Sequence, residues 1–210
     1  MKSLLFFSTA DTDLLAIRKA ATALAGDYGP IDARNPVRVD AQSFEALAAS
    51  VAAGECWAVC LRLLGGRKAM PEGFDLLRRA AAESGTPFLA WPGERGADFE
   101  LEAASTCSPQ LHALTGEYVN QGGIENVEGL LRYLSDGIRS TSYGSAPPHE
   151  VPQHGIYVPG ETQALTVAEW QARRRTKRPV VAIAFYRAHW MSGNLEFMEE
   201  LYREIGRAHV

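Results

Sequence analysis

Three side chains that could do chemistry follow an apolar run near the end of this 210-residue chain. The run, "PVVAIAFY" at residues 179–186, is succeeded by Arg187, His189 and Asn194. Arginine binds carboxylates through paired hydrogen bonds, and histidine can ligate a metal or move a proton near neutral pH. An uninterrupted apolar run is typical of a buried strand, and open α/β sheets bind ligands at the carboxyl ends of their strands. The pattern therefore predicts a strand that brings these side chains to a binding edge, although a single histidine at a strand end more often serves packing.

A second candidate site is a glycine-rich turn after the apolar run at residues 56–64. Gly65 and Gly66 would let backbone amide groups approach a ligand closely, and Arg62 and Arg67 place positive charge beside them. A flexible turn with solvated cations would have the same composition. The position after a predicted strand favours binding, because that is the ligand edge of an open α/β sheet.

Both candidate sites depend on an alternation of strands and helices in the first half of the chain. Apolar runs bounded by turn residues predict strands at residues 3–9, 35–40, 56–64 and 86–94. Apolar residues at helical spacing predict helices between them, at residues 11–29, 41–55 and 74–85. Strands that alternate with helices in this way form a parallel sheet covered on both faces. We therefore predict a small α/β domain over residues 1–95, doubly wound and flavodoxin-like or Rossmann-like.

The remainder of the chain has a different pattern. Residues 96–142 are predicted to form consecutive helices, and residues 143–178 combine a Pro- and Gly-rich linker with a short helix that ends in a basic run. Residues 179–210 contain one strand and one helix, with Ser192 as the expected N-cap of a helix that starts at Gly193. A single strand–helix unit cannot form a sheet, so we expect the start of a second, incomplete α/β domain.

Composition and charge place the chain among ordinary globular proteins. Hydrophobic residues make up 46% and charged residues 22%, and the net charge of −4 gives no indication of a nucleic-acid or anionic-membrane partner. The longest apolar runs are too short to span a bilayer, and no signal-peptide cleavage site follows the N-terminus, so we expect a cytoplasmic protein. Cys56 and Cys60 are expected to be buried thiols in a strand. Together with Cys107 they show neither metal-ligand spacing nor a disulfide framework.

No motif of a familiar catalytic or nucleotide-binding class is present in the sequence. The turn "LLGGRKAMPEG" lacks the Lys-Ser/Thr pair of a phosphate-binding loop, no G-x-G-x-x-G opens a helix, and no G-x-S-x-G nucleophile turn occurs. The acidic residues show no pattern that singles out a pair for glycoside hydrolysis. The residues alone therefore assign no catalytic residue, no metal ligand and no cofactor.

Five segments, taken together and in their order, resemble a known family. They are "LLFFSTADTDLLAIRKA", "LRLLGGRKAMPEGFDLL", "YVNQGGIENVEGLLRYLSD", "HGIYVP" and "PVVAIAFYRAHWMSGNLEFMEEL". They resemble the N-terminal part of the large subunit of aerobic cobaltochelatase, in the CobN/magnesium chelatase large-subunit family. The last two segments are also similar to the magnesium chelatase branch. The resemblance spans nearly the whole chain, and its order and spacing are more specific than any single motif.

The resemblance implies a large multi-domain ligase that inserts cobalt into a corrin precursor of the hydrogenobyrinic acid a,c-diamide type during cobalamin synthesis. Family members bind the tetrapyrrole and Co²⁺ as substrates, and two AAA+-type partner subunits hydrolyse ATP with Mg²⁺. A chain of this kind would need no nucleotide site of its own, which agrees with the missing phosphate-binding loop. We therefore expect no cofactor on this chain and no nucleic-acid or membrane partner.

The resemblance also implies a role at the substrate for the candidate residues. The corrin precursor carries peripheral carboxylates and amides. Arg187 is expected to pair with a carboxylate, Asn194 to hydrogen-bond an amide, and His189 to line the path of the metal, with Arg62 and the glycine turn as further contacts. No catalytic residue is carried over, because the family's main catalytic region is expected beyond Val210.

The last seven residues, "EIGRAHV", depart from the family pattern, in which the helix would continue to another strand. A common sequencing-adapter sequence can encode them, so we expect a truncated gene reading and a longer natural protein. A frayed helix end after Gly206 is the alternative. Two other functional interpretations stay open. One is a stand-alone α/β module that binds a tetrapyrrole or a partner without catalysis, and the other is a magnesium chelatase paralogue.

Overall fold

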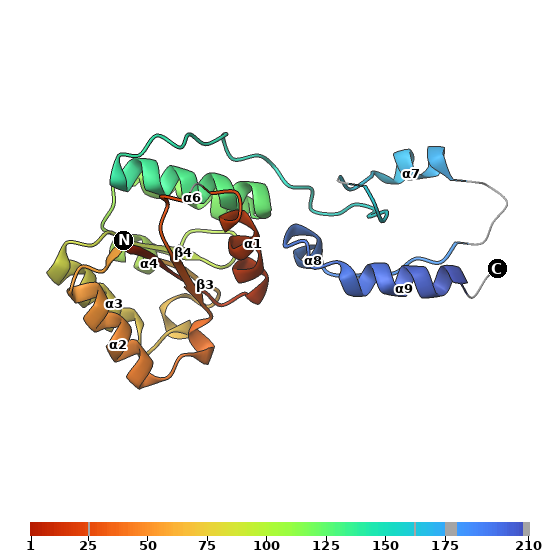
Figure 1. The fold of residues 1–210 in the computed structure, drawn as a ribbon. Helices are drawn as coiled ribbons and strands as arrows, with labels where there is room; N and C mark the ends of the chain where they lie inside the picture. Colours follow the sequence, from red (N-terminus) through yellow and green to blue (C-terminus); the bar gives the residue numbers. More distant parts are fainter. Residues whose placement is uncertain (25, 162, 175–179, 208–210) are drawn as a thin grey trace.

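The structure, a computed structural model, describes residues 1–24, 26–161, 163–174 and 180–207, with the side chains of residues 206 and 207 left aside. Figure 1 shows a sheet enclosed by helices and a last part of the chain that extends to one side of it. We call residues 1–139 the sheet region and residues 140–207 the C-terminal segment.

Among the described residues, the sheet has four strands, all parallel to one another. They are β1 (Ser3–Ser8), β2 (Ile31–Arg34), β3 (Cys56–Leu63) and β4 (Phe88–Pro92). Their spatial order is β2-β1-β3-β4, so the direction in which strands are added reverses between β1 and β3. In the register of this central pair, Ser8 lies beside Arg62 at the carboxyl end. The predicted α/β class with a doubly wound parallel sheet is confirmed, and the order is that of flavodoxin-like folds.

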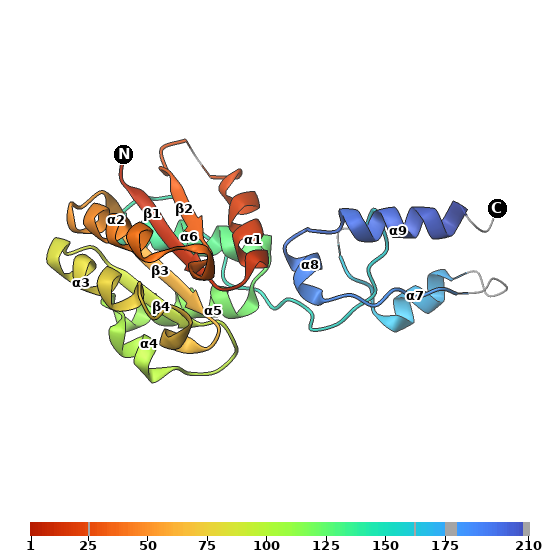
Figure 2. The same cartoon turned by 90° about the horizontal axis from the view of Figure 1, so that it is seen from below.

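Helices cover both faces of this sheet (Figure 2). One face is covered by α1 (Asp11–Ala21), α5 (Pro109–Gln121) and α6 (Ile124–Arg139). The other is covered by α2 (Ala41–Ala52), α3 (Phe74–Ser84) and α4 (Phe99–Ala104). The consecutive helices predicted after residue 96 are thus present, and α6 buries Leu130, Leu131 and Leu134 in the same core as β1. The predicted domain boundary near residue 95 stays a prediction.

The C-terminal segment consists of short helices joined by irregular chain. Its helices are α7 (Val167–Arg173), α8 (Arg187–Met191) and α9 (Glu196–Arg207). Residues 140–153 form no helix or strand, and Asn126 Nδ2 of α6 holds them by donating to the His149 carbonyl at 3.0 Å. The chain returns to the sheet region at α8, where Lys19 Nζ of α1 donates to the Gly193 carbonyl at 2.7 Å. No helix in the described ranges is long and apolar enough to cross a bilayer.

The thiols of β3 are buried, as predicted. Cys56 is 5% exposed, and Cys60 is fully buried in the core beneath α1, α5 and α6. Burial raises the pKa of the Cys60 thiol far above its ordinary value. Because the thiolate is the reactive form, Cys60 is expected to be inert.

The strand predicted at residues 35–40 is wrong. This stretch contains a 3₁₀ turn, Pro36–Arg38, and β2 ends just before it. The Asn35 side chain accepts a hydrogen bond from the Val37 amide at 3.1 Å, and Pro36 has no amide hydrogen to offer a sheet. All four residues of β2 are only half-buried on the sheet edge, so their sequence carries a weak strand signal.

The strand predicted at residues 179–186 is also wrong for the residues that the structure describes, which begin here at Val180. Residues 180–186 pair with no strand in the described ranges, and Val180 and Val181 are 47% and 60% exposed. A strand needs a neighbour that accepts and donates its backbone hydrogen bonds. The apolar run has the strand composition but lacks that neighbour.

The helix predicted to start at Gly193 begins later, with Glu196 of α9. Ser192 is the C-cap of α8, and its hydroxyl donates to the His189 carbonyl at 3.2 Å instead of capping the next helix. Gly193 has φ +65°, a left-handed conformation that ends α8 and turns the chain towards α9. Much of the predicted basic run after α7 and the last three residues of the chain lie outside the described residues.

Candidate ligand-binding site at the carboxyl edge of the sheet

A cavity of about 270 Å³ lies at the carboxyl ends of β1 and β3. Ser8 and Arg62 form its floor, the first turn of α1 and the α5–α6 connection form its walls, and α8 contributes Arg187 to its lining. The position is where the strand order reverses, and open α/β sheets bind their ligands in this crevice. The fold therefore places a cavity where the sequence predicted a binding edge.

The floor of the cavity is a hydrogen-bonded ion pair. Arg62 Nη1 lies 2.6 Å from Asp13 Oδ1, and each of the two side chains is 21% exposed. Ser8 Oγ donates to Asp13 Oδ2 at 2.5 Å, and Arg62 Nη2 donates to the Gly93 carbonyl at 3.2 Å. The Arg62 Nε–H is buried and has no acceptor among the described residues. The guanidinium is thus fixed in place by two hydrogen bonds, while its buried Nε–H stays unused.

Arg187 of α8 also lines the cavity. Its Nε donates to the Pro152 carbonyl at 2.6 Å and its Nη2 to the Val151 carbonyl at 2.9 Å, so the linker orients the guanidinium. Burial, and the positive charge of Arg95 nearby, lower the pKa of Arg187. Neither carbonyl neutralises the charge, so Arg187 adds a cation to the site.

The structure therefore joins Arg62 and Arg187, which stand far apart in the sequence, in one cavity. Sequence reasoning missed Asp13 and Ser8. The signal for both residues was available, because Ser8 ends the first strand and Asp13 lies in the first turn of the following helix, the edge at which α/β folds gather polar side chains.

His189 and Asn194 do not line this cavity. The His189 ring packs edge-on against Phe197 of α9, with the ring centroids 5.0 Å apart, and its Nδ1 is buried without a partner among the described residues. The backbone N–H of Asn194 donates to the His189 carbonyl at 2.8 Å. Both residues belong to the joint between α8 and α9, next to Arg187.

The glycine turn is used mainly to shape the chain after β3. Gly65 and Gly66 have φ values of +89° and +66°, and a Cβ at Gly66 would lie 2.8 Å from Asp98 Oδ2. Asp98 in turn caps α4, since its Oδ1 accepts from the amides of Glu100 and Leu101. Neither glycine lines the cavity beside Arg62.

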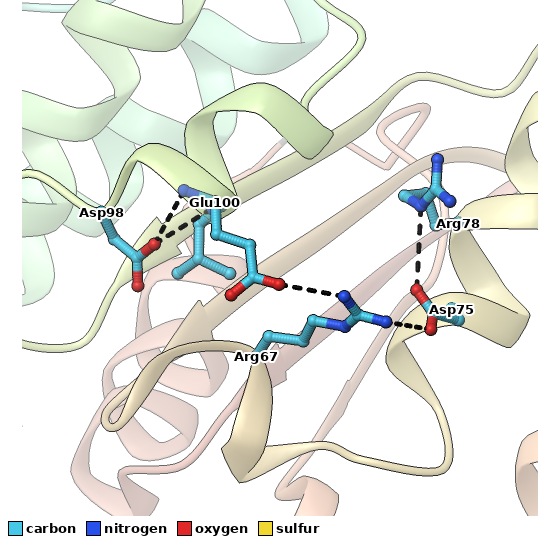
Figure 3. Close-up of polar contacts among 6 residues, drawn as sticks. Arg67, Asp75, Arg78, Asp98 and Glu100 are labelled. Carbon is cyan, nitrogen blue, oxygen red and sulfur yellow. Dashed lines mark hydrogen bonds and ion pairs between the residues drawn. The ribbon is translucent and has the colours of Figure 1, made fainter.

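The cation of the same turn is already paired. Figure 3 shows the Arg67 guanidinium between Asp75 of α3 and Glu100 of α4, with Arg78 on the far side of Asp75. Arg67 Nη1 lies 2.9 Å from Glu100 Oε1. Arg67 therefore joins two helices on the surface and is not available to a ligand at the sheet edge.

A larger cleft of about 760 Å³ opens within the C-terminal segment. Apolar and aromatic side chains line most of it, among them Tyr157, Trp170, Val181, Ile183, Phe185 and Trp190. Arg187 lines this cleft as well as the smaller cavity. The two spaces therefore meet at one guanidinium.

Comparison with known proteins shows that this chain is similar in sequence to CobN proteins. Residues 116–210 match the family model described as CobN/Magnesium Chelatase. The aerobic cobaltochelatase subunit CobN of Pseudomonas aeruginosa is 28% identical over 195 residues, which cover 93% of this chain and 16% of that protein. The protein of the same name from Sinorhizobium sp is 26% identical over 211 residues, with 94% and 16% covered.

A solved structure shares the fold as well as the sequence. The catalytic subunit of cobaltochelatase from Mycobacterium tuberculosis superposes with a TM-score of 0.68 at 27% identity, over 99% of this chain and 15% of that one. The chain thus spans about one sixth of the length of the curated relatives it matches, 16% in both cases. The resemblance seen in the sequence is confirmed: this chain is similar to CobN cobaltochelatase subunits over nearly its whole length, and its residues 116–210 match the CobN/Magnesium Chelatase family model.

Proposed function

We propose that the chain contributes a substrate-binding wall to a cobaltochelatase subunit. Such a subunit would bind a corrin precursor of the hydrogenobyrinic acid a,c-diamide type and insert Co²⁺ into it, driven by two AAA+-type partner subunits that hydrolyse ATP with Mg²⁺. The family match and the likeness to a cobaltochelatase catalytic subunit support this reading.

The observation that carries the proposal is the position of Arg187 between the two spaces. The cleft is large, apolar and rich in aromatic side chains, and its volume of about 760 Å³ is within the usual range of small-molecule sites. A corrin ring has apolar faces and a polar rim of carboxylates and amides. The proposal places the ring in the cleft, and the Arg187 guanidinium at the rim.

The neighbouring residues have supporting roles in this proposal. Asn194 would hydrogen-bond a peripheral amide, and His189 would border the path of the metal. Both lie at the joint of α8 and α9 beside Arg187, so a ring in the cleft would have them near its edge. The main catalytic groups would come from other parts of the subunit.

Tryptophan fluorescence gives a direct test, because Trp170 and Trp190 line the cleft. The corrin precursor is titrated into the chain, and quenching is expected to saturate. A charge-assisted hydrogen bond contributes about 1.5–3 kcal/mol, so Arg187→Ala is expected to weaken binding at least about tenfold. Arg78→Ala, at an exposed arginine on α3, is the matched control and should bind like the parent.

A second assay addresses the reaction. This chain replaces the corresponding region of the full-length Pseudomonas aeruginosa subunit, which is assayed for cobalt insertion with its partner subunits. Arg187→Ala and His189→Ala are expected to slow the reaction. The proposal is rejected if both variants match the parent in precursor affinity and in rate. Insertion of Mg²⁺ but not Co²⁺ would instead favour the magnesium chelatase branch, which the same family model covers.

A further inference from the structure

We infer that the cavity between Arg62 and Arg187 is a carboxylate-binding subsite, which takes one acetate- or propionate-type side chain of a larger ligand. The inference rests on the proposed function only for the identity of the molecule that carries the side chain. The subsite itself follows from charge, hydrogen bonding and size.

The charge balance of the cavity favours an anion. Arg62 and Arg187 line it, and the positive charge of Arg95 is close enough to act on Arg187. Asp13 is the single carboxylate in the lining and is already paired with Arg62. Asp11, in the same helical turn, does not line the cavity and instead contacts Arg38. A ligand therefore meets two guanidinium groups against one carboxylate.

The unused hydrogen-bond donors of the cavity also favour an anion. The Arg62 Nε–H is a buried donor without an acceptor among the described residues, an arrangement that costs free energy until an acceptor arrives. Nη1 of Arg187 makes no hydrogen bond to a described residue, whereas its Nε and Nη2 are used. The first turn of α1 also lines the cavity, and its N-cap, Ala10, provides no side-chain acceptor. A carboxylate oxygen would satisfy these donors and the positive end of α1.

The size and the walls of the cavity select the ligand further. At about 270 Å³ it is well below the cleft next to it, so it admits a substituent and not a macrocycle. Apolar side chains cover the walls between the two arginines, including Phe6, Ile17, Val119, Val127, Leu130 and Met191. Methylene groups would contact these walls while the carboxylate reaches the guanidinium groups.

Asp13 is a positioning residue in this subsite. Its two carboxylate oxygens accept from Arg62 and from Ser8, which holds the Arg62 guanidinium in place. Asp13→Asn would keep the size of the side chain and remove its charge. The variant is expected to shift the Arg62 Nε–H resonance before any ligand is added, whereas Asp13→Glu should restore part of the shift.

The test uses the chain and propionate, a probe without a ring. Arginine Nε–H resonances are followed by ¹H–¹⁵N NMR during the titration, with propionamide and sodium chloride at equal ionic strength as controls. Propionate is expected to move the Arg62 Nε–H resonance in a saturable way, and the controls are not. Arg187→Gln is expected to weaken propionate binding at least tenfold, Arg187→Lys less, and Arg78→Gln not at all.

Three results would overturn the subsite: no saturable shift with propionate, an equal shift with propionamide or chloride, or unchanged affinity in Arg187→Gln. Because Arg187 lies on α8 of the C-terminal segment, outside the core of the sheet region, its variants test the inference even if Arg62→Gln fails to fold. The inference and the proposed function fail separately. Propionate binding without corrin binding would retain the subsite and reject the proposed function. Corrin binding without propionate binding would retain the proposed function and reject the subsite.

Discussion

Two apolar runs of similar composition form different structures in this molecule. The run "CWAVCLRL" forms β3 at the centre of the sheet, paired with β1 on one side and β4 on the other. The run "VVAIAFY" at residues 180–186 pairs with no described strand and leaves much of its apolar surface exposed. The two runs differ in the elements that surround them. The first run has strands on both edges and helices on both faces, and the second faces an open cleft.

The comparison shows what apolar composition does and does not specify. Burial of apolar surface stabilises a strand only when other elements supply the cover. Backbone groups join a sheet only when a partner has the matching register. An apolar run that lacks both presents a surface to which another element can bind, and in this chain that surface also lines the cleft that holds Arg187.

The largest difference in stability between the two runs is expected when one valine in each is replaced by alanine. Val59 is fully buried in β3, whereas Val181 is 60% exposed. Val59→Ala should lower the free energy of unfolding by about 2 kcal/mol, since it removes buried methyl groups and leaves a cavity. Val181→Ala should change it by no more than about 0.5 kcal/mol. Urea unfolding measures both, and similar losses would mean that the second run is covered in solution.

A smaller contrast is expected between two glycines in left-handed conformations. At Gly66 an added Cβ meets the Asp98 carboxylate that caps α4, whereas at Gly193 it meets the far end of the Lys19 side chain. Gly66→Ala should cost about 2 kcal/mol, from backbone strain and a disturbed cap. Gly193→Ala should cost about 1 kcal/mol.

Gly65→Ala is the control for this pair, because it adds the same backbone strain at φ +89° with open space around the Cβ. Thermal unfolding measures the three variants. Gly193→Ala should also expose the α8–α9 joint to limited proteolysis, while Gly66→Ala should not. The reverse pattern would mean that the docking of α8 does not depend on this turn.

The smallest effect concerns two tyrosine hydroxyls, one in the sheet region and one in the C-terminal segment. Tyr28 donates to the Leu131 carbonyl at 2.9 Å inside the sheet region, and burial raises its pKa far above the ordinary value. Tyr157 donates to Glu199 Oε1 at 2.5 Å, and this hydrogen bond, followed by burial, raises the pKa of Tyr157 to about 12.

Because the folded-state pKa of Tyr157 exceeds the unfolded value of about 10, its contribution to stability is complete below about pH 10. It is lost as the pH rises through about 12. Absorbance at 295 nm should show one titration step near pH 12 that disappears in Tyr157→Phe, while Tyr28 stays protonated until the fold is lost. A step that survives in Tyr157→Phe would assign it to another tyrosine.

Much of the fold could be predicted from the sequence, because its local signals agree with the tertiary contacts. β1, β3 and β4 carry continuous apolar runs since helices cover both faces, and α2, α3 and α6 carry clear helical periods. β2 was misplaced because an edge strand buries little and gives a weak signal. The run at residues 180–186 was misassigned because its composition contains no information on whether a partner strand is present.

The candidate site was predictable only in part, for the same reason. Arg62 lies near the end of one apolar run and Arg187 directly follows another, and arginine can bind a carboxylate, so residue type and position together identified them. Ser8 and Asp13 are ordinary polar residues, and their importance depends on the register that brings Ser8 beside Arg62. His189 and Asn194 looked like members of the same set, yet the turn at Gly193 directs them to the joint of two helices.

The sequence by itself determined the class of the fold, the resemblance to one family and the list of charged side chains available to a ligand, since these depend on local periodicity and on the order of motifs along the chain. Only the tertiary structure decided which of those side chains meet. Parallel register placed Arg62 at the edge of the sheet, hydrogen bonds to the carbonyls of Val151 and Pro152 oriented Arg187, and the contact between Lys19 and Gly193 placed α8 over the cavity. These contacts join residues far apart in the chain, and no local pattern encodes the distance between them.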